Sequence, residues 1–458
     1  MNHNSDALVN FWQVIENVLD LSGQDPQNFT KDVINSKLVE FIKKSSDLYM
    51  VYLKEDRDFC HLGLILIESP FFQNNKEFCI RKFLSLLSID ILEMGMKFLI
   101  SYILLLECKK DLTSIDIMVK FQGFGVFYKT LYTQFLYLQK YGDTVHEDDE
   151  VEIEIITSMR NVSTVLLDIL YQTLKYSRCD YEHLQVIDDF FVDYLLTSLR
   201  SDVLDDMFNN AKFRLLLSLN EQYMMFSKSK GLENKVFIFL LKDDTPRTFL
   251  NLILLKFNRR EDPSQHIMMC KMIYLIISTT ENNFAKDYLY LNDLNVFVDV
   301  LIRELQNLSI NDELLRHTLL RLLPPLLQNT ELADTQYRKN DIEDLLYSLI
   351  SSNSLYSSDE NELQYNLTVS LAKKCLTHVS WLSMTPINDK SYLADSDPDL
   401  SRSSTFSLSN ADSLSSIPAQ QNALYTQQQV QAKNQDSKSF KKPLPPPPPP
   451  PSRKKHSH

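Results

Sequence analysis

The segment that decides the fold is KEFCIRKFLSLLSIDILEMGMKFLISYILLL, residues 76–106, where apolar side chains cover more than one face of each helical turn. Their intervals of three and four residues are typical of an α-helix rather than a strand. A helix that is apolar on several faces is stable only where other helices cover those faces. We therefore expect central helices here.

Glycine is scarce along the whole chain. Only seven of the 458 residues are glycine, and none follows Gly231. Nucleotide-binding α/β folds and β-rich domains need glycine in turns and phosphate loops. The composition therefore predicts an all-α protein, and the chain is long enough to bury large apolar cores.

Apolar stripes with helical spacing continue on both sides of this segment. They predict helices at residues 5–19, 33–42, 48–67, 121–141, 155–170, 181–199, 211–227, 236–241, 248–257, 264–278 and 294–308. Short polar links between them stack consecutive helices against each other, which favours a helical solenoid of the armadillo or HEAT type. Because no clean sequence repeat is present, an irregular helical bundle remains the alternative.

Charge and cysteine content argue against several classes of function. The chain carries a net charge of −13, and its residues beyond 390 hold eight Lys or Arg against five Asp or Glu, which leaves −16 on the first 390. Such a body repels phosphates, so we expect no nucleic-acid partner. The six cysteines lie far apart, without zinc-ligand spacing, which predicts buried thiols in a reducing compartment. With no signal peptide and no apolar stretch of bilayer length, we expect a soluble, cytoplasmic protein without a transmembrane segment.

No motif predicts an enzyme. The G-x-S-x-G nucleophile elbow is absent, and the only G-x-G, at Gly123 and Gly125, has no preceding strand. The acidic run HEDDEVEIE, residues 146–154, contains His146, Asp148 and Glu150 as conceivable metal ligands. It is more typical of a solvated loop leading into a helix, whose N-terminal dipole favours carboxylates. We expect no enzymatic activity, no cofactor and no metal site.

Residues 391–458 have a different composition. Ser, Gln, Asn and Asp replace the apolar stripes, and ten of the seventeen prolines lie here, which predicts a disordered tail. Near its end is KKPLPPPPPPPSRKK, residues 441–455, with seven consecutive prolines. Proline fixes φ and has no N–H, so such a run adopts the polyproline II helix with three residues per turn.

This polyproline segment is predicted to bind SH3 domains. Lys442, Pro445 and Pro448 share one edge behind a leading cation, as SH3 ligands require, and Pro448, Pro451 and Arg453 offer the opposite direction. Profilin is a competing partner for the proline run. A stiff spacer is the remaining alternative.

A second stretch is built differently from the rest: LLRHTLLRLLPPLLQNTELADTQYRKNDIEDLLYSL, residues 314–349. Its apolar stripe consists of Leu315, Leu319, Leu322 and Leu323. Pro324 and Pro325 are expected to end this helix, while Arg316 and Arg321 are expected to project from its other faces. A polar linker follows, and Asp341 is the expected cap of the next helix.

In this stretch the chain resembles the WISH/DIP/SPIN family. The matching features are the Leu-Arg-x-Leu-x-Pro-Leu-Leu run at residues 320–327, the Thr330 that follows, and Tyr337-Arg338-Lys339 before the next helix. The layout is similar too, with a helical body at residues 1–390, a leucine-rich segment at about 311–350 within it, and a proline-rich tail at 391–458.

The resemblance implies an armadillo-like fold and an activity. The protein would bind the actin-related protein 2/3 (Arp2/3) complex and activate it without a preformed filament. The product would be linear filaments that seed branched networks in endocytic actin patches at the cell cortex. The candidate contact residues are Arg316, Arg321, Tyr337, Arg338 and Lys339. The alternative function is a helical adaptor that recruits SH3-domain endocytic proteins, or profilin, through its tail.

Overall fold

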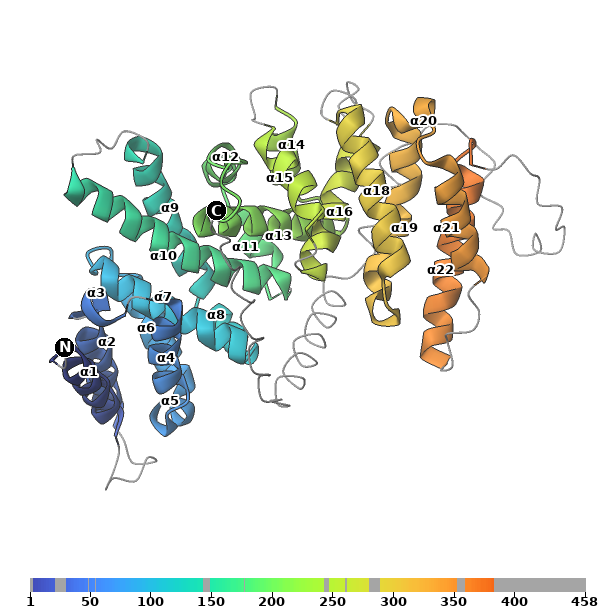
Figure 1. The fold of residues 1–458 in the computed structure, drawn as a ribbon. Coiled ribbons are helices and arrows are strands. Elements are labelled where there is room, and N and C mark those ends of the chain that lie inside the picture. The colour runs from blue at the N-terminus through green and yellow to red at the C-terminus, as the bar shows by residue number, and fades with distance from the viewer. Residues whose placement is uncertain are drawn as a thin grey trace, which may run out of the picture.

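The computed structural model describes residues 3–20, 30–47, 49–53, 55–142, 149–176, 178–242, 247–259, 262–279, 289–351 and 359–382. Within these ranges the regular elements are all helices, and no strand occurs. This confirms the prediction of an all-α protein. Figure 1 shows the helices in an elongated row, with the N terminus at one end and α22 at the other.

The helices range in length from 3 residues in η3 to 26 residues in α10. In chain order they are α1 (His3–Leu19), α2 (Lys31–Asp47), α3 (Tyr49–Tyr52), α4 (Asp56–Ile67), α5 (Pro70–Asn74), α6 (Lys76–Leu87), α7 (Met94–Lys110), α8 (Thr113–Lys120), α9 (Gly123–Tyr141), α10 (Glu150–Lys175), α11 (Tyr181–Val186), α12 (Asp189–Thr197), α13 (Met207–Lys230), α14 (Lys235–Leu240), α15 (Thr248–Phe257), α16 (Pro263–Ser278), α18 (Leu291–Asn307), η3 (Ile310–Asp312), α19 (Glu313–Asn329), α20 (Leu332–Thr335), α21 (Lys339–Ser351) and α22 (Asp359–His378).

Every third helix packs against the next member of the same series. The helices α4, α7, α10, α13, α16, α19 and α22 form one ladder, which we call the spine. A second, looser ladder joins α6, α9 and α12, and another joins α15, α18 and α21. Three-helix units stacked in this way make an armadillo-like solenoid, so the solenoid is confirmed over the irregular bundle.

The spine helices are buried on several sides, as residues 76–106 predict. In α7 the buried side chains include Leu99, Ile100, Ile103, Leu104 and Leu105, which point in different directions around the helix. One continuous apolar cluster runs from Phe11 to Leu382. Burying one such side chain contributes about 1.5–3 kcal/mol, so apolar contact between units holds the solenoid together.

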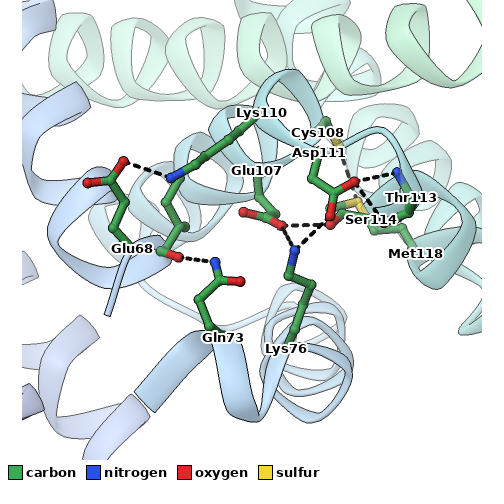
Figure 2. A network of polar contacts seen from close by, with 11 residues as sticks. Glu68, Gln73, Lys76, Glu107, Cys108, Lys110, Asp111, Thr113, Ser114 and Met118 are labelled. Atoms are coloured by element: carbon green, nitrogen blue, oxygen red, sulfur yellow. Dashed lines mark hydrogen bonds and ion pairs between the residues drawn. The ribbon is translucent and has the colours of Figure 1, made fainter. Parts of the chain in front are cut away.

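A polar network fixes the packing of α6, α7 and α8 (Figure 2). Lys76 Nζ lies 2.7 Å from Glu107 Oε1 and 2.8 Å from Asp111 Oδ2. Ser114 donates to the same Glu107 oxygen at 2.7 Å. Because Glu107 is buried, these donors offset the cost of removing its charge from water. The network thereby holds three helices in one arrangement.

Ion pairs also cross the spine. The pairs that link α10, α13 and α16 are Asp168–Arg214, Lys175–Asp262 and Glu221–Lys271. The most buried is Glu221–Lys271, with 2.6 Å between Oε1 and Nζ and side chains that are 1% and 2% exposed. A buried pair of this kind is destabilising to break, so it binds α13 to α16 in one register.

The predicted helix at 181–199 differs from the structure, whereas the acidic run at 146–154 leads into a helix as expected. The predicted helix at 181–199 is two helices: α11 ends at Val186, and Asp188 then caps α12 by accepting from the Phe191 N–H at 2.9 Å. The acidic run does lead into a helix, where Asp149 accepts from the Glu152 N–H at 3.1 Å. His146 and Asp148 lie outside the described residues.

The cysteines and the membrane prediction can also be compared with the structure. Five cysteines are buried, as predicted, whereas Cys60 in α4 is half-buried. None of the helices in the described ranges combines the length and apolar character needed to cross a membrane.

Candidate functional site

The first part of the leucine-rich stretch lies in α19, a spine helix between α16 and α22. The predicted stripe is buried: Leu315, Leu319, Leu322 and Leu323. The helix nevertheless runs through Pro324 and Pro325 and ends at Asn329, so the expected stop at the proline pair is wrong.

The helix continues because a neighbouring helix compensates for the missing proline N–H. In an unbroken helix the residue at position 324 would donate to the Leu320 carbonyl, which Pro324 cannot do. Cys375 on α22, which is fully buried, donates its thiol to that oxygen at 3.2 Å. Beyond the prolines, Leu326 and Leu327 are buried in the core and hold the last turn in place. Tertiary packing therefore overrides the local preference of proline.

Replacing Cys375 with alanine should lower the free energy of unfolding by about 1–3 kcal/mol, because the Leu320 carbonyl is left unpaired in the core. Urea denaturation measures the change. The matched control is Cys270→Ala, which removes an equally buried thiol from α16, whose only proline is in its first turn. Equal losses in the two variants would contradict a specific role for the thiol of Cys375.

Arg316 lies inside the protein rather than projecting from it. It is 5% exposed, and its Nη2 donates to the carbonyls of Leu308 at 2.7 Å and Ser309 at 3.3 Å. It also forms an ion pair with Glu313. Leu308 is the C-cap of α18, so the guanidinium stabilises the carboxyl end of that helix. The expected outward position of Arg316 is wrong because the connection through η3 covers this face of α19.

Arg321 is half-buried on the same helix, and burial lowers its pKa. Trp381 lies in the turn after α22 and donates its Nε1–H to the Leu327 carbonyl at 3.2 Å. The Trp381 hydrogen bond thus joins the residues after α22 to the last turns of α19.

Tyr337 and Arg338 meet one carboxylate from another helix. Tyr337 Oη donates to Asp299 Oδ2 at 3.2 Å, and Arg338 Nη1 donates to Asp299 Oδ1 at 2.9 Å. Arg338 Nε also donates to Asp341 at 2.5 Å. This hydrogen bond raises the pKa of Arg338, and the charges of both carboxylates act in the same direction. The side chain of Arg338 remains 39% exposed, so its outer face is available to a partner.

The helix α21 begins earlier than predicted. It starts at Lys339, so Asp341 lies in its first turn instead of capping it. Gln336 and Arg338 precede it with φ of 49° and 56°, a left-handed conformation that costs energy for residues other than glycine. The two carboxylates that bind Arg338 hold it in this conformation. Lys339 Nζ lies 3.9 Å from Glu343.

We give the name α21 cluster to a group of half-buried and exposed residues: Asp299, Tyr337, Arg338, Lys339 and Asp341. Sequence reasoning identified its basic and aromatic members as candidates but missed the role of Asp299. That residue is separated from Arg338 by 39 positions, so no local spacing connects the two. Arg321 and Arg316 do not belong to the cluster.

The tail candidates cannot be placed. Lys442, Pro445, Pro448, Pro451 and Arg453 all lie outside the described residues. Within the described part of the chain, no group of three or more His, Cys, Asp or Glu side chains could hold a metal ion.

A family model described as SPIN90/Ldb17, leucine-rich domain, matches residues 205–342. The match begins just before α13 and extends into α21, so it includes α19 and the whole α21 cluster.

Relatives match over longer ranges. Protein LDB17 of Saccharomyces cerevisiae is 46% identical over 404 residues, which are 83% of this chain and 82% of the relative. Protein LDB17 of Eremothecium gossypii is 49% identical over 373 residues, 80% of each chain. Protein dip1 of Schizosaccharomyces pombe is 30% identical over 205 residues, 43% of this chain and 54% of the relative. The chain therefore belongs to the SPIN90/DIP/WISH family of Arp2/3 complex activators, as its leucine-rich motifs predicted.

Proposed function

We propose that this protein binds the Arp2/3 complex and activates it without a preformed filament, producing linear filaments that seed branched actin networks. The observation that carries the proposal is the family relationship, at 46% identity over 83% of the chain. The proposed activity is binding that shifts a conformational equilibrium, so it requires no catalytic group and no cofactor.

The solenoid is suited to such a role. A ligand shifts an equilibrium between two conformations only if it binds one of them more tightly, and a change from 1:99 to 99:1 needs about 5.5 kcal/mol of differential affinity. The spine is joined by a continuous apolar cluster and by buried ion pairs. A body held together in this way can favour the active arrangement of a multisubunit partner because it resists deforming to fit the inactive one.

We infer that the α21 cluster is part of the contact, with Tyr337, Arg338 and Lys339 as its donors. Arginine and tyrosine are enriched among the residues that dominate interface energetics. Arg338 is positioned by two carboxylates and keeps an exposed face. Arg321 is half-buried and would lie at the margin, whereas the buried Arg316 supports α18 instead.

Assembly of pyrene-labelled actin with purified Arp2/3 complex, without filament seeds, tests the proposal. The protein should shorten the lag, and an unchanged lag would contradict activation. Arg338→Glu should lower the assembly rate about 10-fold or more, since loss of a central arginine commonly costs 2 kcal/mol or more. The control Arg57→Glu reverses an exposed arginine of α4, remote from the cluster. Thermal melting of both variants verifies that they remain folded.

The second candidate function is a passive adaptor, which the polyproline segment favours. In this version the body binds some other protein, and the tail recruits SH3-domain proteins of the endocytic machinery or profilin. It predicts tail-dependent pulldown of an SH3 protein with no effect on the actin lag. We propose that in either case the tail directs the protein to cortical actin patches in the cytoplasm.

Replacing Lys442 and Arg453 together with alanine should weaken binding to SH3 domains about 10-fold while leaving the proline run intact, because SH3 ligands depend on a flanking cation. Isothermal titration with a tail peptide measures the affinity. If profilin is the partner, affinity should hardly change in this variant and should fall when prolines are deleted.

A further inference from the structure

An open groove lies in the N-terminal half of the solenoid, between the chain preceding α4 and the first turns of α7 and α10. Its volume is about 640 Å³. The apolar lining residues are Leu53, Phe59, Met94, Phe98 and Ile153. The acidic residues Glu150 and Glu154, both exposed, form its rim on α10. This groove is outside the region matched by the family model and separate from the α21 cluster.

Three packed aromatic rings shape the surface of the groove. The rings of Phe59 and Phe98 meet edge to face, with centroids 5.2 Å apart and an interplanar angle of 85°. The ring of Tyr102 lies 5.7 Å from Phe59 and 5.9 Å from Phe98. Its hydroxyl donates to Asp56 at 2.7 Å, which holds the ring in place. Grooves between aromatic rings are the surfaces on which polyproline II helices dock.

Exposed apolar side chains flank the lining residues. Val51, Ile91 and Val151 are 55%, 95% and 68% exposed, and each lies two or three positions from a lining residue in the chain. An apolar surface of this kind, rimmed by polar residues, marks an interaction site. The occupant must therefore combine apolar contact with positive charge.

We propose that this groove binds the chain's own polyproline segment, residues 441–455. The segment combines eight prolines and Leu444 with five Lys or Arg and no acidic residue. The prolines match the aromatic floor, and the flanking cations match Glu150 and Glu154, which can accept charge-assisted hydrogen bonds.

The chain is long enough for this contact. The groove adjoins α10, which is four spine steps from α22, and packed helices lie about 8–10 Å apart, so the lateral distance is about 40 Å. Residues 383–440 separate the described body from the segment. At up to about 3.4 Å per residue they can span about 200 Å. Binding within one molecule is therefore sterically permitted.

The consequence is regulation of the tail. A docked segment presents its proline ridges to the groove and is withheld from SH3 domains until one of them competes for it. This inference rests on the groove and the composition of the tail alone, so it holds or fails independently of Arp2/3 activation.

Carbodiimide cross-linking of the full chain, read by mass spectrometry, tests it. The reagent joins lysine to carboxylate without a spacer. We expect links from Lys441, Lys442, Lys454 or Lys455 to Glu150 or Glu154, at a yield independent of protein concentration. The ion pair between Lys110 and Glu68, 2.7 Å apart, provides an internal reference for reactivity.

A groove variant that keeps every reactive group makes the test specific. Ile153→Arg places a bulky cation in the groove and should reduce the tail links at least 5-fold. The matched control is Ile238→Arg on α14, since Ile153 and Ile238 are 40% and 41% exposed. Absence of tail links, or equal yields in the two variants, would overturn the proposal. A yield that rises with concentration would also overturn it, because the occupant would then be the tail of a second copy.

Discussion

Replacing Glu221 with leucine is expected to lower the free energy of unfolding by about 3–5 kcal/mol. Glu221 on α13 lies 2.6 Å from Lys271 Nζ on α16, and both side chains are almost completely buried. Removing the carboxylate takes away the negative charge that lies 2.6 Å from the buried Lys271 ammonium and helps to offset its lost hydration. The spine should weaken at this joint, in the middle of the region matched by the family model.

Guanidinium denaturation of the purified chain measures this loss. The double variant Glu221→Leu/Lys271→Met should recover most of it, since an apolar pair of similar volume commonly replaces a buried ion pair without cost. As a control, Glu77→Leu breaks the exposed pair of Glu77 with Lys120, which should contribute no more than about 1 kcal/mol. A loss of similar size in the exposed and buried variants would argue against an important role for burial.

Acidification should destabilise the solenoid through His317 of α19. This histidine is 3% exposed, and its Nε2 lies 2.9 Å from Thr368 Oγ1 and 3.2 Å from the Gln364 carbonyl, both on α22. Burial lowers the pKa of His317 from 6.5 to about 4, and the positive charge of Arg321 acts in the same direction.

The carboxylate of Glu313, 3.4 Å from His317, does not reverse this shift, because Glu313 is already paired with Arg316. Between pH 6.5 and about pH 4, His317 binds a proton in the unfolded chain but not in the folded chain. The stabilisation is therefore complete above pH 6.5 and is lost as the pH falls, by about 1.4 kcal/mol per unit and about 3 kcal/mol in all.

Unfolding free energies of the protein and of His317→Gln, measured at intervals from pH 7 to pH 4, isolate this contribution. Other groups titrate in both proteins, so the difference between the two curves reports His317 alone. We expect the glutamine variant to lose less stability on acidification. Parallel curves would contradict the lowered pKa, because they would mean that His317 has the same pKa in the folded and unfolded chain.

Much of the fold could be predicted because helices follow local periodicity. The helix at Thr248–Phe257 matches its prediction, and the scarcity of glycine agrees with the lack of strands in the residues that the structure describes. The three-helix period was not predictable, since packing between units depends on complementary shape and each interface uses different residues. Pro324 and Pro325 illustrate the limit: a thiol from α22, 55 positions away from Leu320, compensates for the missing donor.

The candidate site could be predicted only in part, for a similar reason. The motif around Tyr337 and Arg338 was identified from short-range sequence, and the structure brings both onto Asp299. Arg316 is also an arginine of the leucine-rich stretch, so its sequence context is comparable to that of Arg338. It is buried because carbonyl groups at Leu308 and Ser309 need a donor. Which arginine is available to a partner is decided by the neighbouring loop, which the helix's own spacing does not reveal.

The every-third-helix spine has a mechanical consequence. Because each spine helix is in contact mainly with the preceding and following members, a small tilt at one joint is passed on to everything beyond it. When the tilts at successive joints have the same direction, they add up along the row, just as the small rotations between units add up to the curvature of a solenoid. The distance between α4 and α22 therefore behaves like the length of a stiff spring, in which each joint yields little and the two ends move most.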